Sequence, residues 1–435
     1  FDTNRVPSGA ARDVYLLALS TRFPTPLTAN DPLIQQYVAA GFNNNAFFRR
    51  LDPNLEVPES YQFNIGFERE VGAGFVAEAN FTYNKTVRLW REFNANAPRV
   101  PQGFKSLTDA LVNCTNAQLC PFLTANPNIR FERAGNAVGT PDTRTVGTVT
   151  FVNLDSLNNS TAATSPYGRA REAVRFFRPL DINLEQVEQV ASIGNSQYRG
   201  LVLELRRRYR KIGFGFGTSF RAAYTLSKLE DDGIVNTSSA QTVGDFSAEF
   251  TRSLLDRRHR FALSGVFDTP RWMGKLRFSP LLRLGSSAPF NISNGGDNQD
   301  DRNLDDVNTD RPNFSGTLSD LRWRRDTEPL NPALTGTFSL PPLGTSGNLP
   351  RNAGRGPGQF IFDLSVSRMF KFTERMSLRP SIEFDNIFNS TNFSFGSEFI
   401  NATNGSSIGL IPSDFLIPQR AFRPRQIRVG LRFDF

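Results

Sequence analysis

The residues best suited to chemistry lie in one acidic segment, 295–313, which reads GGDNQDDRNLDDVNTDRPN. Carboxylate oxygens at this density are the hard ligands that Ca²⁺ prefers. The segment lacks the order of an EF-hand loop, with no Gly at the sixth position and no Glu at the twelfth. The alternative is a solvated acidic loop, partly neutralised by Arg302 and Arg311. The candidate calcium ligands are Asp297, Asp300, Asp301 and Asp305, and no other cofactor is expected.

Two cysteines, Cys114 and Cys120, are the only ones in the chain and lie in the stretch CTNAQLC. This spacing favours a local disulfide inside a loop and therefore an oxidising compartment. A metal site with two thiolates is less favoured, because no histidine or further cysteine lies nearby to complete it. Two free thiols are the remaining alternative.

His259 is the only histidine, and Asp256 is its nearest acidic neighbour in the sequence. Two residues three positions apart on a strand point to opposite faces, so they do not form a catalytic pair there. No serine or cysteine nucleophile is arranged with them. We expect a structural histidine and no enzymatic activity.

Two further motifs resemble nucleotide or nucleic-acid sites. The glycines of GFGFG (213–217) lack the G-x-G-x-x-G spacing of a dinucleotide fingerprint, so we interpret them as glycines on the polar face of a strand. The basic run RRRYRK (206–211) is interpreted as polar-face arginines that run into a turn. No nucleic-acid partner is expected.

The elements that must position these residues are strands. In the last eleven residues, RQIRVGLRFDF, apolar side chains alternate with polar ones, which predicts a strand with one apolar face. Such strands average about 5–6 residues in soluble proteins, whereas a tilted strand needs about 9–11 to cross a bilayer. The same alternation, over similar or greater lengths, predicts nine strands at 60–70, 74–86, 199–210, 214–226, 259–270, 275–285, 360–370, 377–388 and 425–435, with a tenth candidate at 12–20.

The connections between these strands alternate strictly in length. The short ones lie near 71–73, 211–213, 270–274 and 371–375, and the long ones span 87–197, 228–257, 286–358 and 390–422. Bacterial outer-membrane barrels have short periplasmic turns and long extracellular loops. The sequence therefore predicts an all-β fold, a transmembrane antiparallel β-barrel, in contact with outer-membrane lipid.

Composition agrees with this fold class. The chain has 435 residues, 40 of them Phe, and a net charge of +8 that comes mostly from arginine. The sequence contains no run of about 18 apolar residues, so it predicts no transmembrane helix. The sequence around Phe1 does not resemble a signal peptide, and we expect a processed or truncated piece of a longer protein.

Four stretches resemble the barrel of TonB-dependent outer-membrane receptors, in particular the Oar-like group. They are residues 52–70 with 79–98, residues 196–209 with 219–232, SIEFDNIFNSTNF (381–393) and the terminal RQIRVGLRFDF. The resemblance covers most of the predicted strands. It implies that residues 1–435 are the C-terminal part of a barrel of 22 strands, of which nine or ten are present.

The resemblance also implies partners and a function. The family has a signal peptide and a plug domain with a TonB-contacting segment, and none of these is visible here. Uptake powered through the TonB complex would belong to the full-length parent, with an extracellular ligand bound by the long loops. The terminal aromatics Phe433 and Phe435 resemble the signal that the barrel-assembly machinery recognises. Iron chelates, oligosaccharides, peptides and cobalamin are all open as ligands, as is a role in export or adhesion.

Three rival interpretations make different predictions. A passive porin-like or adhesive barrel of about ten strands would be closed by its own first and last strands. A barrel enzyme would depend on His259. A soluble, arginine-rich β-sandwich would bind nucleic acid with strong salt dependence. The regular alternation of short and long connections favours the membrane barrel.

Overall fold

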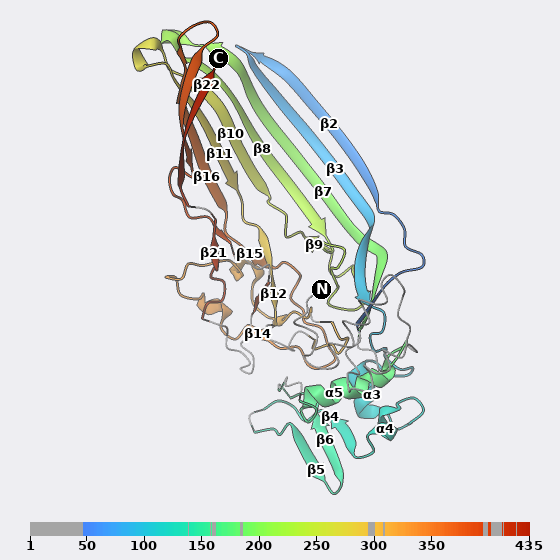
Figure 1. The fold of residues 1–435 in the computed structure, drawn as a ribbon. Coiled ribbons are helices and arrows are strands. Elements are labelled where there is room, and N and C mark those ends of the chain that lie inside the picture. Colours follow the sequence, from blue (N-terminus) through green and yellow to red (C-terminus); the bar gives the residue numbers. More distant parts are fainter. Residues whose placement is uncertain are drawn as a thin grey trace, which may run out of the picture.

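A computed structural model describes residues 47–435, apart from 138, 157, 159–161, 183–185, 295–300, 308, 395–398, 402–410, 412 and 423. The candidate strand at 12–20 lies outside the described residues. All nine of the other predicted strands are present (Figure 1). Their bounds are β2 (Glu59–Gly72), β3 (Phe75–Asn94), β7 (Gln186–Lys211), β8 (Gly217–Asp231), β10 (His259–Asp268), β11 (Leu276–Gly285), β16 (Gln359–Arg368), β18 (Ser377–Asp385) and β22 (Gln426–Asp434).

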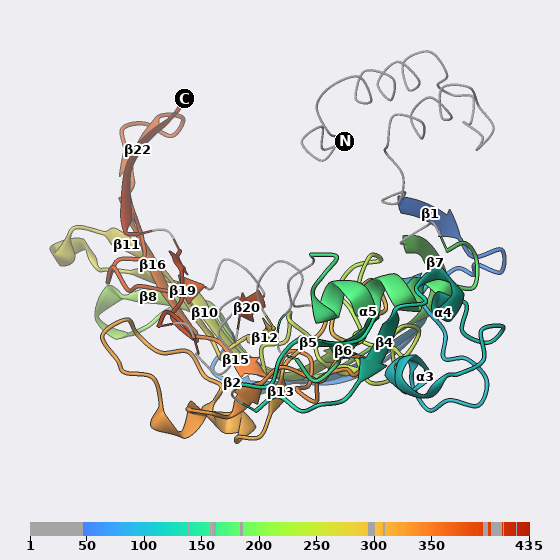
Figure 2. The same cartoon turned by 90° about the horizontal axis from the view of Figure 1, so that it is seen from below.

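These nine long strands form one antiparallel sheet in sequence order, from β2 at one edge to β22 at the other. Three shorter strands join them: β1 (Phe47–Leu51) beside β7, β9 (Thr251–Arg252) beside β8, and β17 (Phe370–Lys371) beside β18. Seen from the loop end, β22 and β1 lie at opposite sides of the molecule (Figure 2). Among the described residues β2 pairs only with β3, and β22 only with β18, so no pairing between them closes the sheet.

The two ends of the sheet differ, and we call them the turn end and the loop end. At the turn end Gly72 and Phe75 leave only two residues between β2 and β3, and the other three connections are also short. At the loop end β3 and β7 are joined by residues 95–185, and β11 and β16 by residues 286–358. The predicted alternation of short and long connections is present throughout the sheet.

The predicted loop 87–197 was too long at both ends. Residues up to Asn94 belong to β3, and residues from Gln186 belong to β7, and the two strands pair as far as Asn94 and Glu188. The register shifts between Thr86 and Leu89 and again before Trp90. These bulges change the phase of the side chains and hide the alternation from a sequence pattern.

The two faces of the sheet separate apolar from charged side chains. On the apolar face Val429 and Leu431 are 80% and 72% exposed, which requires a covering that the described chain does not supply. On the polar face arginines pair with carboxylates on the next strand or on the strand beyond it. These pairs are Arg206–Glu68 at 2.6 Å, Arg221–Glu204 at 2.7 Å and Arg283–Asp363 at 2.8 Å.

One prediction at the turn end was wrong. Gly213 and Gly215 do not lie in a strand; with Phe214 they form a 3₁₀ turn, η3 (Gly213–Gly215), between β7 and β8. Phe214 has a φ of 61° and Gly215 a φ of 83°, because the chain must reverse within a few residues. Gly217 does begin β8, as an in-strand glycine should. Phe214 is 93% exposed beyond the strand ends.

The long connections carry most of the remaining structure. Residues 95–185 contain the helices α3 (Leu107–Asn113), α4 (Phe122–Ala125) and α5 (Pro166–Val174), the 3₁₀ helix η2 (Arg175–Phe177), and a sheet of β4 (Ile129–Glu132), β5 (Thr143–Val146) and β6 (Val149–Asn153). The other loops contain β12 (Pro289–Ser293), β13 (Asn313–Phe314), β14 (Phe338–Ser339), β15 (Gly354–Arg355), β19 (Phe393–Ser394), β20 (Phe399–Asn401), β21 (Arg420–Ala421) and short 3₁₀ turns. Among the described residues, no helix has the length and hydropathy needed to cross a membrane.

Candidate functional site at the loop end

The loops pack into one body, which we call the loop layer and define as the described residues of 95–185, 232–258 and 286–358. One hydrophobic core of this layer lies around α3, α5 and β6, where Phe122, Val152 and Ala170 are fully buried. Leu304 and Leu343 from the loop after β11 are buried in the same core. The layer is therefore held together across segments that are distant in the sequence.

Cys114 and Cys120 form a disulfide in this core, just after α3. Cys120 is fully buried, and Cys114 is 6% exposed. Among the described residues there is no free cysteine. The bond ties the end of α3 to the start of α4.

Replacing both cysteines by alanine should lower the stability of the loop layer by about 2 kcal/mol, because the unfolded loop gains freedom. We expect faster proteolysis within 95–185 and unchanged protection of the sheet, read by mass spectrometry of the fragments. Ser106→Ala removes the side-chain cap of α3 and is the comparison variant, because its effect should be confined to that helix. Equal cleavage rates in wild type and the cysteine variant would contradict a stabilising role.

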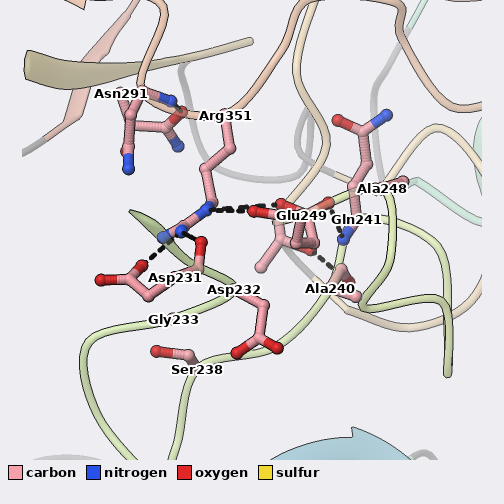
Figure 3. A network of polar contacts seen from close by, with 12 residues as sticks. Asp231, Asp232, Gly233, Ser238, Ala240, Gln241, Ala248, Glu249, Asn291 and Arg351 are labelled. Atoms are coloured by element: carbon pink, nitrogen blue, oxygen red, sulfur yellow. Dashed lines mark hydrogen bonds and ion pairs between the residues drawn. The ribbon is translucent and has the colours of Figure 1, made fainter. Parts of the chain in front are cut away.

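Buried ion pairs join the loops to one another and to the end of β8. Both Nη atoms of Arg311 donate to the Glu249 carboxylate at 2.9 Å, and both side chains are buried. Arg351 lies between Asp231 and Glu249 (Figure 3). It pairs with the Asp231 carboxylate at 2.5 Å and donates to the Glu249 carbonyl at 3.0 Å. These contacts join the end of β8 to two different loops.

Another buried ion pair joins the end of β3 to the residue that follows β8. Arg91 donates from Nε to Asp232 Oδ1 at 2.7 Å and from Nη2 to the Gly233 carbonyl at 2.7 Å. The other Asp232 oxygen accepts the backbone N–H of Asn195 at 2.6 Å. Sequence reasoning missed Arg91, Asp232, Glu249 and Arg351, because no local pattern links residues that are brought together only by the fold.

The described part of the acidic segment, 301–307 and 309–313, is buried or half-buried, against the alternative of a solvated loop. Asp301 Oδ1 accepts the N–H of Asp305, and Asp305 Oδ1 accepts the N–H of Val307, both at 2.9 Å. Asp306 pairs with Arg178 at 2.7 Å and with Arg171 at 3.3 Å. These carboxylates hold the segment against α5 and η2. Arg302 is fully buried and donates to the Pro341 carbonyl, and burial lowers the pKa of Arg302 to about 10.

The calcium hypothesis stays a prediction. Asp297 and Asp300 lie outside the described residues, so the structure places only Asp301 and Asp305 of the four candidate ligands. Within the described part of the chain, no group of three or more His, Cys, Asp or Glu side chains is arranged to hold a metal ion. Asp301 and Asp305 instead accept backbone hydrogen bonds that shape the loop.

Asp310 should make the stability of the loop layer depend on pH. Burial, and then the nearby Asp301 carboxylate, raise the pKa of Asp310 well above its ordinary value of 3.8. A raised folded-state pKa means that stability is full below about pH 4 and is lost as the pH rises through the folded pKa.

We therefore expect proteolysis of the loop layer to be slower at about pH 5 than at about pH 8. Asp310→Asn should weaken this dependence, because it removes one buried group that must lose its proton. Asp326→Asn, an exposed change in the same layer, should leave the dependence intact. An Asp310→Asn variant with the wild-type pH profile would contradict this account.

A cavity of about 510 Å³ opens within the loop layer. Segments from the end of β3, the loop after β8 and the loop after β11 all line it. Arg99 and Lys105 provide exposed positive charge, and Asn303 and Ser346 provide hydrogen-bonding groups. Phe93, Val100, Leu107 and Val243 provide apolar surface. Such a mixture suits a ligand with both apolar and polar parts.

The other candidate residues have structural contacts. His259 begins β10, and its Nδ1 lies 2.7 Å from the Tyr224 hydroxyl. Asp256 accepts from Arg252 at 2.6 Å and from the Leu229 N–H at 3.0 Å. Both carboxylate oxygens of Asp256 therefore bond to groups other than the His259 imidazole. His259 and Asp256 are therefore not brought together as a catalytic pair.

The C-terminal aromatics lie at the turn end of β22. Phe433 and Phe435 stack at 6.0 Å between ring centroids, and Phe435 is 93% exposed. Phe433 shares the apolar face with Leu378, its partner on β18. An exposed aromatic pair at a strand end is typical of the girdle where a barrel meets the bilayer interface.

The sequence from residue 2 to residue 428 matches the model of the outer membrane beta barrel domain family. The chain therefore belongs to this family, and its location is the bacterial outer membrane. The apolar face is the lipid-facing side of the sheet and the polar face lines the lumen. Since barrels of this class have short periplasmic turns, the turn end is periplasmic and the loop end is extracellular.

Solved structures with a similar chain path are outer-membrane transporters and receptors. The transporter YddB from Escherichia coli is 8% identical, with a TM-score of 0.40, over 89% of this chain and 34% of that chain. The ferric citrate transporter FecA is 11% identical, with a TM-score of 0.34, over 93% and 33%. The ferripyoverdine receptor of Pseudomonas aeruginosa is 10% identical, with a TM-score of 0.34, over 88% and 28%. The chain thus spans about a third of their length, and no curated protein matches it.

Proposed function

We propose that the chain is part of a TonB-dependent outer-membrane receptor that binds an extracellular ligand in its loop layer. The observation that carries the proposal is the 510 Å³ cavity, which is walled by three loop segments; buried ion pairs join these loops to one another and to the end of β8. A site on fixed loops is pre-organised, which lowers the cost of binding. The loop layer would recognise the ligand, and the polar face would line its path.

Energised uptake belongs in this proposal to the full-length protein. The sequence resemblance to TonB-dependent receptors of the Oar-like group supports it. Partner strands for the edges of β2 and β22 would come from the rest of a larger barrel, because unpaired edges do not persist in lipid. The plug would contact the TonB complex, and the barrel-assembly machinery would insert the protein.

Growth on single nutrients tests this function. Wild-type cells, cells lacking the gene and cells lacking TonB would be compared on ferric siderophores, cobalamin, oligosaccharides and oligopeptides at limiting concentration. We expect one nutrient class to fail in both mutants. Failure in the gene deletion alone would identify a passive pore, and this outcome would contradict energised uptake.

A cavity-filling variant tests the binding site itself. Thr242 lines the cavity, and its hydroxyl lies 3.0 Å from that of Ser346. Thr242→Trp should reduce uptake at limiting nutrient at least about tenfold, or ~1.4 kcal/mol of binding. Thr317→Trp, at an exposed threonine outside the cavity lining, is the matched control and should change uptake less than about twofold. Equal effects of the two variants would place the site elsewhere.

A further inference from the structure

Arg69 and Arg207 lie on the apolar face near the periplasmic end of the sheet, on the two strands next to β3. On β2, Arg69 follows Phe63, Ile65 and Phe67 at every second position. On β7, Arg207 follows Leu203 and Leu205 in the same way, so the interpretation of the run 206–211 as polar-face arginines was wrong at Arg207. The pairing register confirms their face, because Arg69 lies opposite Ala77 and Arg207 lies opposite Phe75, and Ala77 and Phe75 are apolar-face residues of β3.

The two guanidinium groups therefore flank β3. Strands β2 and β7 lie on either side of it, so their backbones are two strand spacings apart, about 10 Å. Arginine side chains are long enough to approach one small anion from both sides of this gap. On β3, Ala77 lies opposite Arg69 and Phe75 lies opposite Arg207, and the small side chain of Ala77 fills little of the space above the strand.

No carboxylate neutralises these charges within the described chain. Neither Arg69 nor Arg207 forms an ion pair, whereas Arg206 next to Arg207 pairs with Glu68 on the polar face. Arg207 lies over the Phe75 ring, 4.9 Å from its centroid, and its Nε is buried without a hydrogen-bond partner. Unpaired charge on a lipid-facing surface is costly, so an anion from outside the chain is expected there.

A groove of about 480 Å³ runs along the same face from Arg69. Over β3 its floor is made of the small side chains Ala77 and Ala79, with Phe67 of β2 on one side and Leu203 and Leu205 of β7 on the other. The groove is narrow, apolar and open toward the lipid. This shape suits an extended hydrocarbon chain.

We propose that this surface binds one glycerophospholipid of the periplasmic leaflet, with its phosphate between Arg69 and Arg207 and an acyl chain in the alanine-floored groove. Guanidinium groups match phosphate with paired hydrogen bonds, and arginine stems extend along apolar surface toward the bilayer interface. The site would hold a lipid at the β2–β3–β7 part of the sheet, independently of any ligand at the loop end.

Native mass spectrometry of the full-length protein in detergent micelles, titrated with phosphatidylglycerol, tests the proposal. We expect one retained lipid per chain, and at least tenfold weaker retention for the double variant Arg69→Gln, Arg207→Gln. Arg69→Lys, Arg207→Lys should retain part of the binding. Arg206→Gln changes the preceding residue of β7, which pairs with Glu68 on the polar face, and is the matched control that should bind like wild type.

Two further measurements distinguish binding of the lipid headgroup from binding of its acyl chain. Ala79→Phe, which fills the groove, should weaken lipid retention several-fold while leaving both arginines in place. Inorganic phosphate at the same concentration should not bind. Each variant's fold is checked by its heat-modifiable migration in gels. Wild-type retention by the Arg69→Gln, Arg207→Gln variant, equal loss in Arg206→Gln, or equal binding of free phosphate would overturn the proposal.

Discussion

Removing Phe435 should lower the amount of folded protein in the outer membrane at least about tenfold. The residue is 93% exposed at the end of β22, so its deletion removes almost no packing from the described chain. A large effect would therefore come from recognition by another protein, which we propose to be the barrel-assembly machinery. Truncating an aromatic anchor at such a contact typically costs about 2 kcal/mol or more.

Phe372→Ala is the matched control for this deletion. Phe372 also lies at the periplasmic end of the sheet and is 61% exposed, but it is internal to the chain. The measurement is the level of each variant in isolated outer membranes, compared with total protein. If both changes reduced the level equally, general loss of an interfacial aromatic would explain the effect and a terminal signal would be contradicted.

Arg311→Ala should loosen the loop layer by separating its segments 232–258 and 286–358. Arg311 donates two hydrogen bonds of 2.9 Å to Glu249, and both partners are buried. Its removal leaves the Glu249 carboxylate buried with less compensation, which typically costs about 3–5 kcal/mol. We expect faster hydrogen exchange across the loop layer, loss of ligand uptake, and unchanged protection of the nine long strands.

The control for this variant is Arg144→Ala. Arg144 also donates two hydrogen bonds to one carboxylate, that of Glu132, but its side chain is 48% exposed. Exposed pairs of this kind typically contribute about 0–1 kcal/mol. Comparable exchange rates in the two variants would show that burial of the Arg311–Glu249 pair does not stabilise the layer.

The strands could be predicted because their pattern is local. Alternation in residues 425–435 is sufficient to predict β22, since side chains of a strand point to opposite faces in turn. The pattern failed where the backbone is irregular. Bulges near Leu89 hid the outer part of β3, and the positive φ of Phe214 turned a run of alternating residues into a 3₁₀ turn.

The loop layer could not be predicted in the same way. Arg311 and Glu249 are 62 residues apart in the sequence, and neither lies in a periodic element that would place it. The acidic segment was recognised by its composition, but its burial depends on Leu304, Arg171 and Arg178, which come from different parts of the chain. The cavity likewise exists only once three loops have packed together.

The most direct test of the proposed receptor is the coding DNA upstream of the codon for Phe1. If the chain is the barrel portion of a TonB-dependent receptor, the reading frame continues upstream for several hundred codons and encodes a plug-like region preceded by a signal peptide. A signal peptide that begins within about 30 codons of Phe1 would instead define a complete small barrel. That result would contradict energised uptake and favour passive diffusion or adhesion.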